Sequence, residues 1–370
     1  MSPLGFVVPG RLDQVTGGYL FDRRLVDGLR ARGRAVRVIE LDGRFPDADD
    51  TARRAAAAAL AATPDDGVVV IDGLALPGFD DCLAAHSARL RLIGFVHHPL
   101  SAEAGGAPAD LARHGETEAR LWPLLRGIVC ASAHTARAVC AAGIAPARVA
   151  VASPGTERPV SEATAHAGAA HEGGGSLHDA VGPPRERSGP LRLLAVGTVT
   201  PRKGHLALVE ALAGLRALDW RLDCVGSLAR DAGCVAAVRE AIEAHRIGDR
   251  ITLRGELSVA DLERAWRQAD VFVLPSLHEG YGMAFAEALV RGLPVVATTA
   301  GALPETVPAE ASLRVPPGDV GALREALHRL IVEPGLHASL AAGARRAGAG
   351  LPDWPLAVDR WIAAVDRIAV

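Results

Sequence analysis

The stretch VFVLPSLHEGYGMAFAEALVRGLPVVATT, residues 271–299, decides the fold of this chain. Its apolar runs at Val271–Leu274 and Leu293–Ala297 have the length and composition of strands that are buried on both faces of a parallel sheet. Between them lie a glycine-bearing loop and, from Met283 onward, a segment whose residues favour a helix. The unpaired amide groups at the start of that helix should point out of the loop and attract anions.

Two carboxylates flank this predicted anion site, Glu279 in the loop and Glu287 in the helix. Glu287 lies in the apolar sequence AFAEAL, where a charge without a partner would be costly. A carboxylate only accepts hydrogen bonds, so it can chelate two neighbouring hydroxyl groups of a ribose or a hexose. The arrangement predicts a nucleotide-sugar site. The alternative is that Glu279 is a solvated loop residue and Glu287 a helix-surface residue.

The segment HEGYGMAFAEAL resembles the E-x7-E signature of the retaining glycosyltransferases of family 4, which have the two-domain GT-B fold. The flanking VFVLPS and GLPVVAT resemble strands of that family. The resemblance implies that Glu287 holds the ribose of the donor nucleotide and that Glu279 holds hydroxyl groups of the donor sugar. It also implies that a run of loop amides faces the sugar and the phosphates, those of Gly280, Tyr281, Gly282 and Met283.

Length and composition permit two domains with separate cores, since the chain has 370 residues of which 49% are apolar. The net charge of −3 gives no reason to expect nucleic acid as a partner. The N-terminus lacks the pattern of an export signal, and no run of about 18 apolar residues occurs, so we expect a cytoplasmic protein. The five cysteines include no C-x-x-C pair, which indicates neither a disulfide framework nor a zinc site.

The first half alternates apolar runs with helical segments, an order that predicts a doubly wound parallel sheet. The predicted strands are Leu4–Val8, Ala35–Leu41, Val68–Ile71, Leu90–Val96, Ile128–Ala131 and Val149–Ala152. The loop after the first strand ends in Gly17 and Gly18, and its spacing differs from the G-x-G-x-x-G of NAD-binding proteins. In the family a similar glycine pair lies against the donor phosphates or the acceptor. The alternative is an ordinary flexible connection.

His97 and His98 directly follow the fourth predicted strand, and ligands of such sheets bind at the carboxyl ends of the strands. The family carries a histidine after the equivalent strand, close to the donor sugar, and His97 is the position that matches best. The alternative is a histidine that only caps a turn before Pro99.

Asp47-Ala48-Asp49 has the D-x-D pattern that marks the metal site of the other large glycosyltransferase fold. It lies just before an alanine-rich segment at residues 52–62, where acidic residues favour the start of a helix. We therefore predict helix capping rather than metal binding.

The second domain is predicted to open at Leu191 with LRLLAVG, followed by TVTPRKG and a helix. The pattern V-G-x5-K-G resembles the phosphate loop of the family, and Lys203 matches its lysine. Thr198 stands where the family often has an arginine, and Arg202 is the candidate for the missing charge. Cations are needed here, because two carboxylates near a diphosphate repel it by ~1 to 4 kcal/mol for each close pair. The alternative is a solvated basic pair in a turn.

Together these patterns predict an α/β chain with the GT-B architecture, two Rossmann-like doubly wound parallel-sheet domains that face a cleft. The expected parts are an acceptor-binding domain at 1–155, a flexible linker at 156–190 rich in Gly, Ser and Pro, a donor-binding domain at 191–353, and a helix at 354–370 that crosses back to the first domain.

The predicted function is transfer of a sugar from a nucleoside diphosphate sugar to a glycan, lipid or small-molecule acceptor, without a metal or other cofactor. Retention of configuration is implied by the resemblance. The expected catalytic residues are His97, Lys203, Arg202 and Glu279. The arginines of the first helix permit peripheral contact with a membrane. Two alternatives stay open: a GT-B nucleotide-sugar epimerase or hydrolase, and a sugar-nucleotide-binding protein without catalysis.

Overall fold

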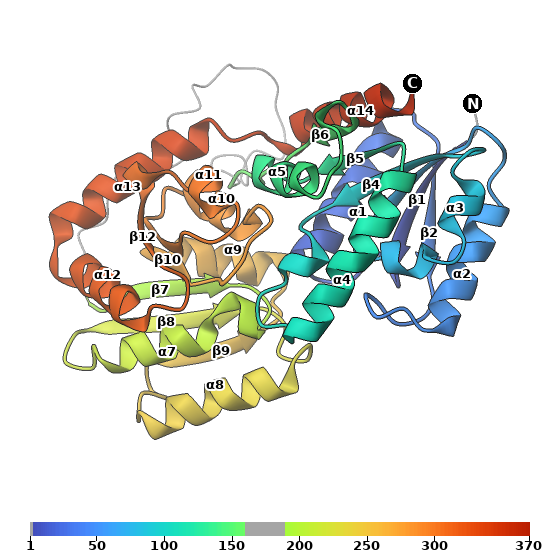
Figure 1. The fold of residues 1–370 in the computed structure, drawn as a ribbon. Coiled ribbons are helices and arrows are strands. Elements are labelled where there is room, and N and C mark those ends of the chain that lie inside the picture. The colour runs from blue at the N-terminus through green and yellow to red at the C-terminus, as the bar shows by residue number, and fades with distance from the viewer. Residues whose placement is uncertain (1–2, 160–188) are drawn as a thin grey trace, which may run out of the picture. The chain divides into compact units, whose positions relative to one another are not determined.

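The computed structural model describes residues 3–159 and 189–370, so residues 160–188 of the predicted linker lie outside the described residues. The chain forms two compact units (Figure 1). The first unit comprises Met1–Gly155, His278–Tyr281 and Pro352–Val370, and the second comprises Thr156–Leu277 and Gly282–Leu351. None of the helices in the described ranges combines the length and the apolar character that crossing a membrane requires.

The first unit is built on six parallel strands in the order β2-β1-β3-β4-β5-β6. The strands are β1 (Leu4–Pro9), β2 (Val36–Leu41), β3 (Val68–Asp72), β4 (Arg91–Val96), β5 (Gly127–Cys130) and β6 (Val149–Val151). The helices are α1 (Gly17–Ala31), α2 (Asp50–Ala61), α3 (Leu83–His86), α4 (Pro108–Leu121), α5 (Ala133–Ala141) and α14 (Trp354–Ala369). The strand order reverses between β1 and β3, and in such sheets the crevice at this point binds ligands.

The second unit repeats this plan with the strand order β12-β11-β10-β7-β8-β9, again all parallel. The strands are β7 (Leu191–Val196), β8 (Trp220–Val225), β9 (Ile251–Gly255), β10 (Val271–Leu274), β11 (Val295–Thr298) and β12 (Ser312–Val315). The helices are α7 (His205–Ala213), α8 (Ala232–Ala244), α9 (Val259–Gln268), α10 (Met283–Val290), α11 (Leu303–Thr306), α12 (Val320–Val332) and α13 (Pro334–Ala349). Here the order reverses between β7 and β10.

Each unit has its own aromatic core. In the first, Trp361 of α14 packs on Phe6 of β1 and Phe95 of β4, with ring centroids 5.9 Å away in both cases. The last helix is therefore part of the core of the first unit (Figure 1). In the second, Phe272 of β10 packs between Trp266 and Phe285, at 5.4 and 5.0 Å.

The predicted strands agree with the structure to within two residues at their ends, the usual uncertainty of such boundaries. Helix α1 differs in one respect that concerns the site. It begins at Gly17, so Gly17 and Gly18 form its first turn instead of ending the preceding loop. Their amides thus belong to the helix start, where backbone N–H groups have no partner within the helix.

Candidate functional site

The basic loop after β7 is held against the segment that follows β10. A short 3₁₀ turn, Pro201–Lys203, precedes Gly204, whose φ of +72° favours glycine. A Cβ atom at Gly204 would lie only 2.2 Å from the carbonyl oxygen of Pro275. The amide of Leu277 donates a hydrogen bond of 2.7 Å to the carbonyl of Arg202. The two loops therefore meet at the reversal point of the second sheet, two residues before Glu279.

Glycines directly after β7 and β8 allow other groups to pack close to the backbone at this edge of the sheet. A Cβ atom at Gly197 would lie 3.6 Å from the Cδ and Cε atoms of Lys203, so the lysine stem passes beside the backbone there. Gly226, with a φ of +144°, leaves room for the carbonyl of Gly197. His205, two residues after Lys203, is buried, and burial together with Lys203 lowers its pKa to about 4. The histidine is therefore neutral, and the positive charge of this loop comes from Arg202 and Lys203.

The loop that leads into α10 has the predicted form. Helix α10 begins at Met283, and Gly282 before it has a φ of +95°. A Cβ atom there would crowd Leu303 and Phe285, both at 3.0 Å, so glycine is required for both conformation and space. Glu287 lies in this helix among buried neighbours and is half-buried itself, while Tyr281 in the loop is also half-buried. The side chain of Glu279 is only 6% exposed.

In the first unit, the structure brings His97 together with the start of α1. His97 follows β4 directly, and a Cβ atom at Gly18 would lie 3.8 Å from the Cδ2 atom of its ring. The ring packs between Phe95 and Phe21, with centroid distances of 4.5 and 5.6 Å. Gly18 and His97, predicted separately, are therefore neighbours at the reversal point of the first sheet, and Gly17 precedes them in the same helical turn.

Two buried carboxyl groups that the sequence analysis missed face the same ring nitrogen of His97. The Nε2 atom lies 3.1 Å from Oδ1 of Asp22 on α1 and 3.4 Å from Oδ2 of Asp72 at the end of β3. Asp22 is 0% and Asp72 4% exposed. Two signals were present in the sequence: an aspartate within the apolar pattern of a helix, and another directly after a strand at the ligand-binding edge.

Burial and mutual contact displace the pKa values of all three groups. Burial, reinforced by Asp72, raises the pKa of Asp22 to about 8. Burial would also raise the pKa of Asp72, but the hydrogen bond and positive charge of His97, together with hydrogen bonds from Asp22 and the amide of Leu74, outweigh burial and lower that pKa below the usual range. Burial lowers the pKa of His97, yet the two carboxyl groups overcome this and raise it to about 10.

The D-x-D segment has a structural role. Asp49 caps α2 by accepting a hydrogen bond of 2.9 Å from the amide of Ala52, which confirms the predicted capping. Asp47 pairs with Arg113 at 2.8 Å and with His114 at 3.2 Å. Both aspartates are thus accounted for by contacts within the first unit.

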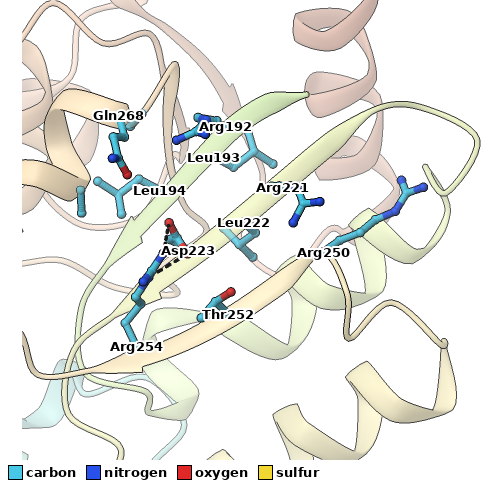
Figure 2. Close-up of a pocket in the computed structure, with 12 residues that line it drawn as sticks. Arg192, Leu193, Leu194, Arg221, Leu222, Asp223, Arg250, Thr252, Arg254 and Gln268 are labelled. Atoms are coloured by element: carbon cyan, nitrogen blue, oxygen red, sulfur yellow. Dashed lines mark hydrogen bonds and ion pairs between the residues drawn. The ribbon is translucent and has the colours of Figure 1, made fainter. Parts of the chain in front are cut away.

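A separate cavity of about 360 Å³ lies on one face of the second sheet (Figure 2). It is lined by residues of β7, β8, β9 and α9, and none of the predicted site residues is among them. Arg192 and Arg221 stand in register on β7 and β8, and Arg250 directly precedes β9. Asp223 and Arg254 form an ion pair of 3.0 Å at the other end (Figure 2).

Two doubly wound parallel-sheet units of this kind constitute the GT-B fold, and solved structures agree. Sucrose-phosphate synthase from Thermosynechococcus elongatus matches with a TM-score of 0.77 and 20% identity over 98% of each chain. Anabaena Alr3699/HepE in complex with UDP and glucose matches with a TM-score of 0.70 and 18% identity, over 97% of this chain and 98% of that one. Identities this low show the fold alone.

Sequence comparison adds a family match within the second unit. Residues 190–333 match the family model described as glycosyl transferases group 1. The MMP alpha-(1->4)-mannosyltransferase of Mycolicibacterium hassiacum is 31% identical over 188 residues, 50% of this chain and 45% of the relative. The 2-deoxystreptamine glucosyltransferase of Streptomyces kanamyceticus is 30% identical over 199 residues, 48% of this chain and 50% of the relative. The chain thus spans about half the length of the curated relatives it matches.

Proposed function

We propose that this protein is a glycosyltransferase that moves a sugar from a nucleoside diphosphate sugar to an acceptor, with retention of configuration and without a metal ion. The observation that carries the proposal is the meeting of two loops at the reversal point of the second sheet. One brings Arg202 and Lys203, the other leads to Glu279 and the start of α10, and both belong to the region that matches the group 1 glycosyl transferases.

The chemistry requires that negative charge growing on the leaving diphosphate be stabilised as the sugar becomes cation-like. Lys203 and Arg202 supply fixed positive charge, and the amides of residues 280–283 supply hydrogen bonds at the start of α10. Glu287 chelates the ribose hydroxyls and Glu279 those of the sugar, because carboxylates only accept hydrogen bonds. These groups stabilise the diphosphate leaving group without a metal.

The first unit contributes His97 and the helix start at Gly17 and Gly18. In the proposal His97 donates a hydrogen bond to the donor sugar or its phosphates, and the amides of the two glycines approach the phosphates or the acceptor. Retention and the family 4 assignment rest on the E-x7-E resemblance. A lipid acceptor would bring the protein to a membrane surface.

The first donor to test is UDP-glucose, which is bound in the solved structure of Anabaena Alr3699/HepE, a protein with the same fold. The protein is incubated with UDP-glucose and with GDP-mannose, each with and without a panel of sugar and lipid acceptors. Products are followed by chromatography and the anomeric configuration by NMR. Product that forms only with an acceptor supports transfer. Release of free sugar or an epimer without any acceptor would favour the hydrolase or epimerase, and binding without turnover would favour the non-catalytic alternative.

Lys203→Ala is the variant that tests the role of the basic loop. We expect turnover to fall by roughly 100-fold, since removal of one stabilising group for a developing anion has effects of this order. Nucleoside binding should change less. Arg239→Ala, which removes an exposed positive charge on α8, is the control and should keep full activity. Wild-type kinetics in Lys203→Ala would remove the lysine from the mechanism.

A further inference from the structure

The cluster of Asp22, Asp72 and His97 brings together two buried carboxyl groups and a half-buried imidazole in the first unit. One atom of each side chain lies within 4.8 Å of the others. The three residues come from α1, the end of β3 and the segment after β4, so the fold rather than local sequence assembles them. No step of the proposed transfer uses the two aspartates.

Charge balance decides how many protons the cluster holds. A buried group of charges is least costly when its sum is zero, because net charge cannot be solvated there. With two ionised carboxylates and an imidazolium the sum is −1, and with a neutral imidazole and one ionised carboxylate it is also −1. The sum is zero when His97 is an imidazolium and the two carboxyl groups share one further proton, or when the imidazole is neutral and both carboxyl groups are protonated. Only the first of these states leaves Asp72 as an ionised acceptor for the amide of Leu74.

Hydrogen bonding gives the same assignment. Oδ1 of Asp72 accepts a bond of 2.6 Å from the amide of Leu74, which suits an ionised carboxylate. Oδ2 of Asp22 is buried and has no partner in the described parts of the chain, a position that would be costly for an anionic oxygen. Asp22 is therefore the carboxyl group that carries the shared proton, and Asp72 is the counter-charge of His97.

The orientation of the ring follows from these contacts. Nε2 of His97 is committed to the two carboxyl groups, and Phe95 and Phe21 restrain the plane of the ring. The other nitrogen, Nδ1, has no hydrogen-bond partner within residues 3–159 and 189–370 and is not enclosed. An imidazolium held in this way has one N–H left to donate.

We propose that Asp22 and Asp72 are positioning residues that hold His97 as an imidazolium, with its Nε2–H donated to the carboxyl pair and its Nδ1–H left to donate to an oxygen atom of the substrate. The proposal rests on the proposed function for the identity of that substrate. The state of the cluster itself does not depend on transferase activity. A divalent metal ion held by the same three side chains is the competing use of the cluster, and the test separates the two.

The direct test is NMR of the imidazole resonances of the full chain, with His97 identified by the signal that His97→Gln loses. At pH 7.5 we expect His97 to be an imidazolium, whereas an unperturbed histidine has a pKa near 6.5 and is mostly neutral there. The double variant Asp22→Asn/Asp72→Asn should make His97 neutral at this pH, because no counter-charge remains. Each single variant keeps one carboxylate and should keep the imidazolium.

Asp27→Asn, an exposed position on the same helix, is the matched control and should leave the His97 signal unchanged. A neutral His97 in the wild type, or an imidazolium that survives in the double variant, would overturn the proposal. The wild-type result does not depend on the double variant, so a double variant that fails to fold does not remove the test. Displacement of the His97 signal by added Zn²⁺ or Mn²⁺ that EDTA reverses would assign the cluster to a metal instead.

Kinetics then connect the cluster to the substrate. In each single variant the disturbed geometry should lower kcat with UDP-glucose by roughly tenfold, while KM changes little because the nucleotide is held by the second unit. Unchanged kcat in the double variant, with His97 shown by NMR to be neutral, would show that the cluster is only structural. Absence of turnover in the wild type would count against the proposed function, and the NMR result would still decide the state of the cluster.

Discussion

At the scale of single residues, the sharpest feature is the contrast between Asp22 and Asp72, two neighbouring carboxyl groups with opposite pKa displacements. Desolvation acts on both, and both face Nε2 of His97, but only Asp72 also accepts a hydrogen bond from the amide of Leu74. The different surroundings of the two carboxyl groups therefore favour the neutral form of Asp22 and the charged form of Asp72, as is common for pairs of neighbouring acids.

This contrast predicts how stability depends on pH. The folded-state pKa values of Asp22, about 8, and His97, about 10, both exceed the ordinary values of 3.8 and 6.5. Groups of this kind stabilise the fold below their unfolded pKa and lose that contribution as pH rises through the folded pKa. We expect the melting temperature of the first unit to fall as pH rises from 6 to 9, with a slope in free energy of up to about 1.4 kcal/mol per pH unit for each proton.

Asp22→Asn imitates the protonated carboxyl group and cannot ionise. Its melting temperature should therefore fall less steeply than that of the wild type between pH 6 and 8, and calorimetry at several pH values measures the difference. Asp27→Asn should follow the wild type throughout. Parallel profiles for Asp22→Asn and the wild type would contradict the assignment of the neutral form to Asp22.

Several candidate site residues were proposed from the sequence because each carries a local signal. Lys203, Glu279 and Glu287 lie in motifs of a few residues beside glycines, and His97 directly follows a strand. Asp22 and Asp72 could not be predicted in the same way. Their partners are 75 and 25 positions away in the chain, and only the tertiary fold shows that their carboxyl groups are buried together.

At the scale of elements, the apolar runs determine most of the strands, since a strand buried on both faces must be apolar throughout. One strand that the sequence does not predict is β12, Ser312–Val315. Its sequence SLRV is short and includes the exposed Arg314, as suits a strand at the edge of a sheet. The start of α1 was placed two residues late because glycines at 17 and 18 indicate a loop by propensity.

The conformation of the basic loop that carries Arg202 and Lys203 depends on Gly204. Gly204→Ala should destabilise the second unit by about 1 to 3 kcal/mol, since the new Cβ meets the carbonyl of Pro275 and φ is +72°. Denaturant unfolding measures the change. Gly335→Ala in α13 is the control, because nothing lies within 4 Å of a Cβ atom there, and it should be neutral or slightly stabilising. Equal stability of Gly204→Ala and the wild type would mean that the loop is not held as described.

The arginines of the cavity in Figure 2 provide a second test at this scale. Arg192, Arg221 and Arg250 lie on neighbouring strand positions, and none of their guanidinium groups forms an ion pair with a residue of the described ranges. Backbone carbonyls instead hold two of them, Leu218 for Arg250 at 2.7 Å and Asp249 for Arg221 at 3.4 Å. Strands are about 4.8 Å apart, so the three like charges repel one another.

Removing the central charge should relieve this repulsion. Arg221→Gln should raise the melting temperature of the second unit by roughly 1 to 2 °C at low salt, and the gain should fade at about 0.5 M NaCl as screening increases. Arg239→Gln on α8 controls for the loss of an exposed arginine elsewhere in the unit. A lower melting temperature of Arg221→Gln at low salt would show that the row of arginines stabilises the sheet.

At the scale of the whole molecule, the sequence patterns predicted two Rossmann-like sheets, and the structure confirms them. The last helix belongs to the first unit, because the ring of Trp361 lies in the core around Phe6 and Phe95. Residues 190–333 match the group 1 glycosyl transferases. The two loops that meet at the reversal point of the second sheet lie within the same unit. The central claim is therefore a nucleotide-sugar site in the second unit.

The measurement that tests this claim most directly is calorimetric titration of the full chain with UDP, GDP, ADP and their sugars. We predict saturable binding of one nucleoside diphosphate by the wild type. The affinity of Glu287→Ala should be roughly 10- to 100-fold weaker, because this variant loses charged hydrogen bonds to the ribose. The control Glu325→Ala, on the exposed face of α12, should bind with unchanged affinity. No binding of any nucleoside diphosphate by the wild type, or equal affinity of Glu287→Ala and the wild type, would contradict it.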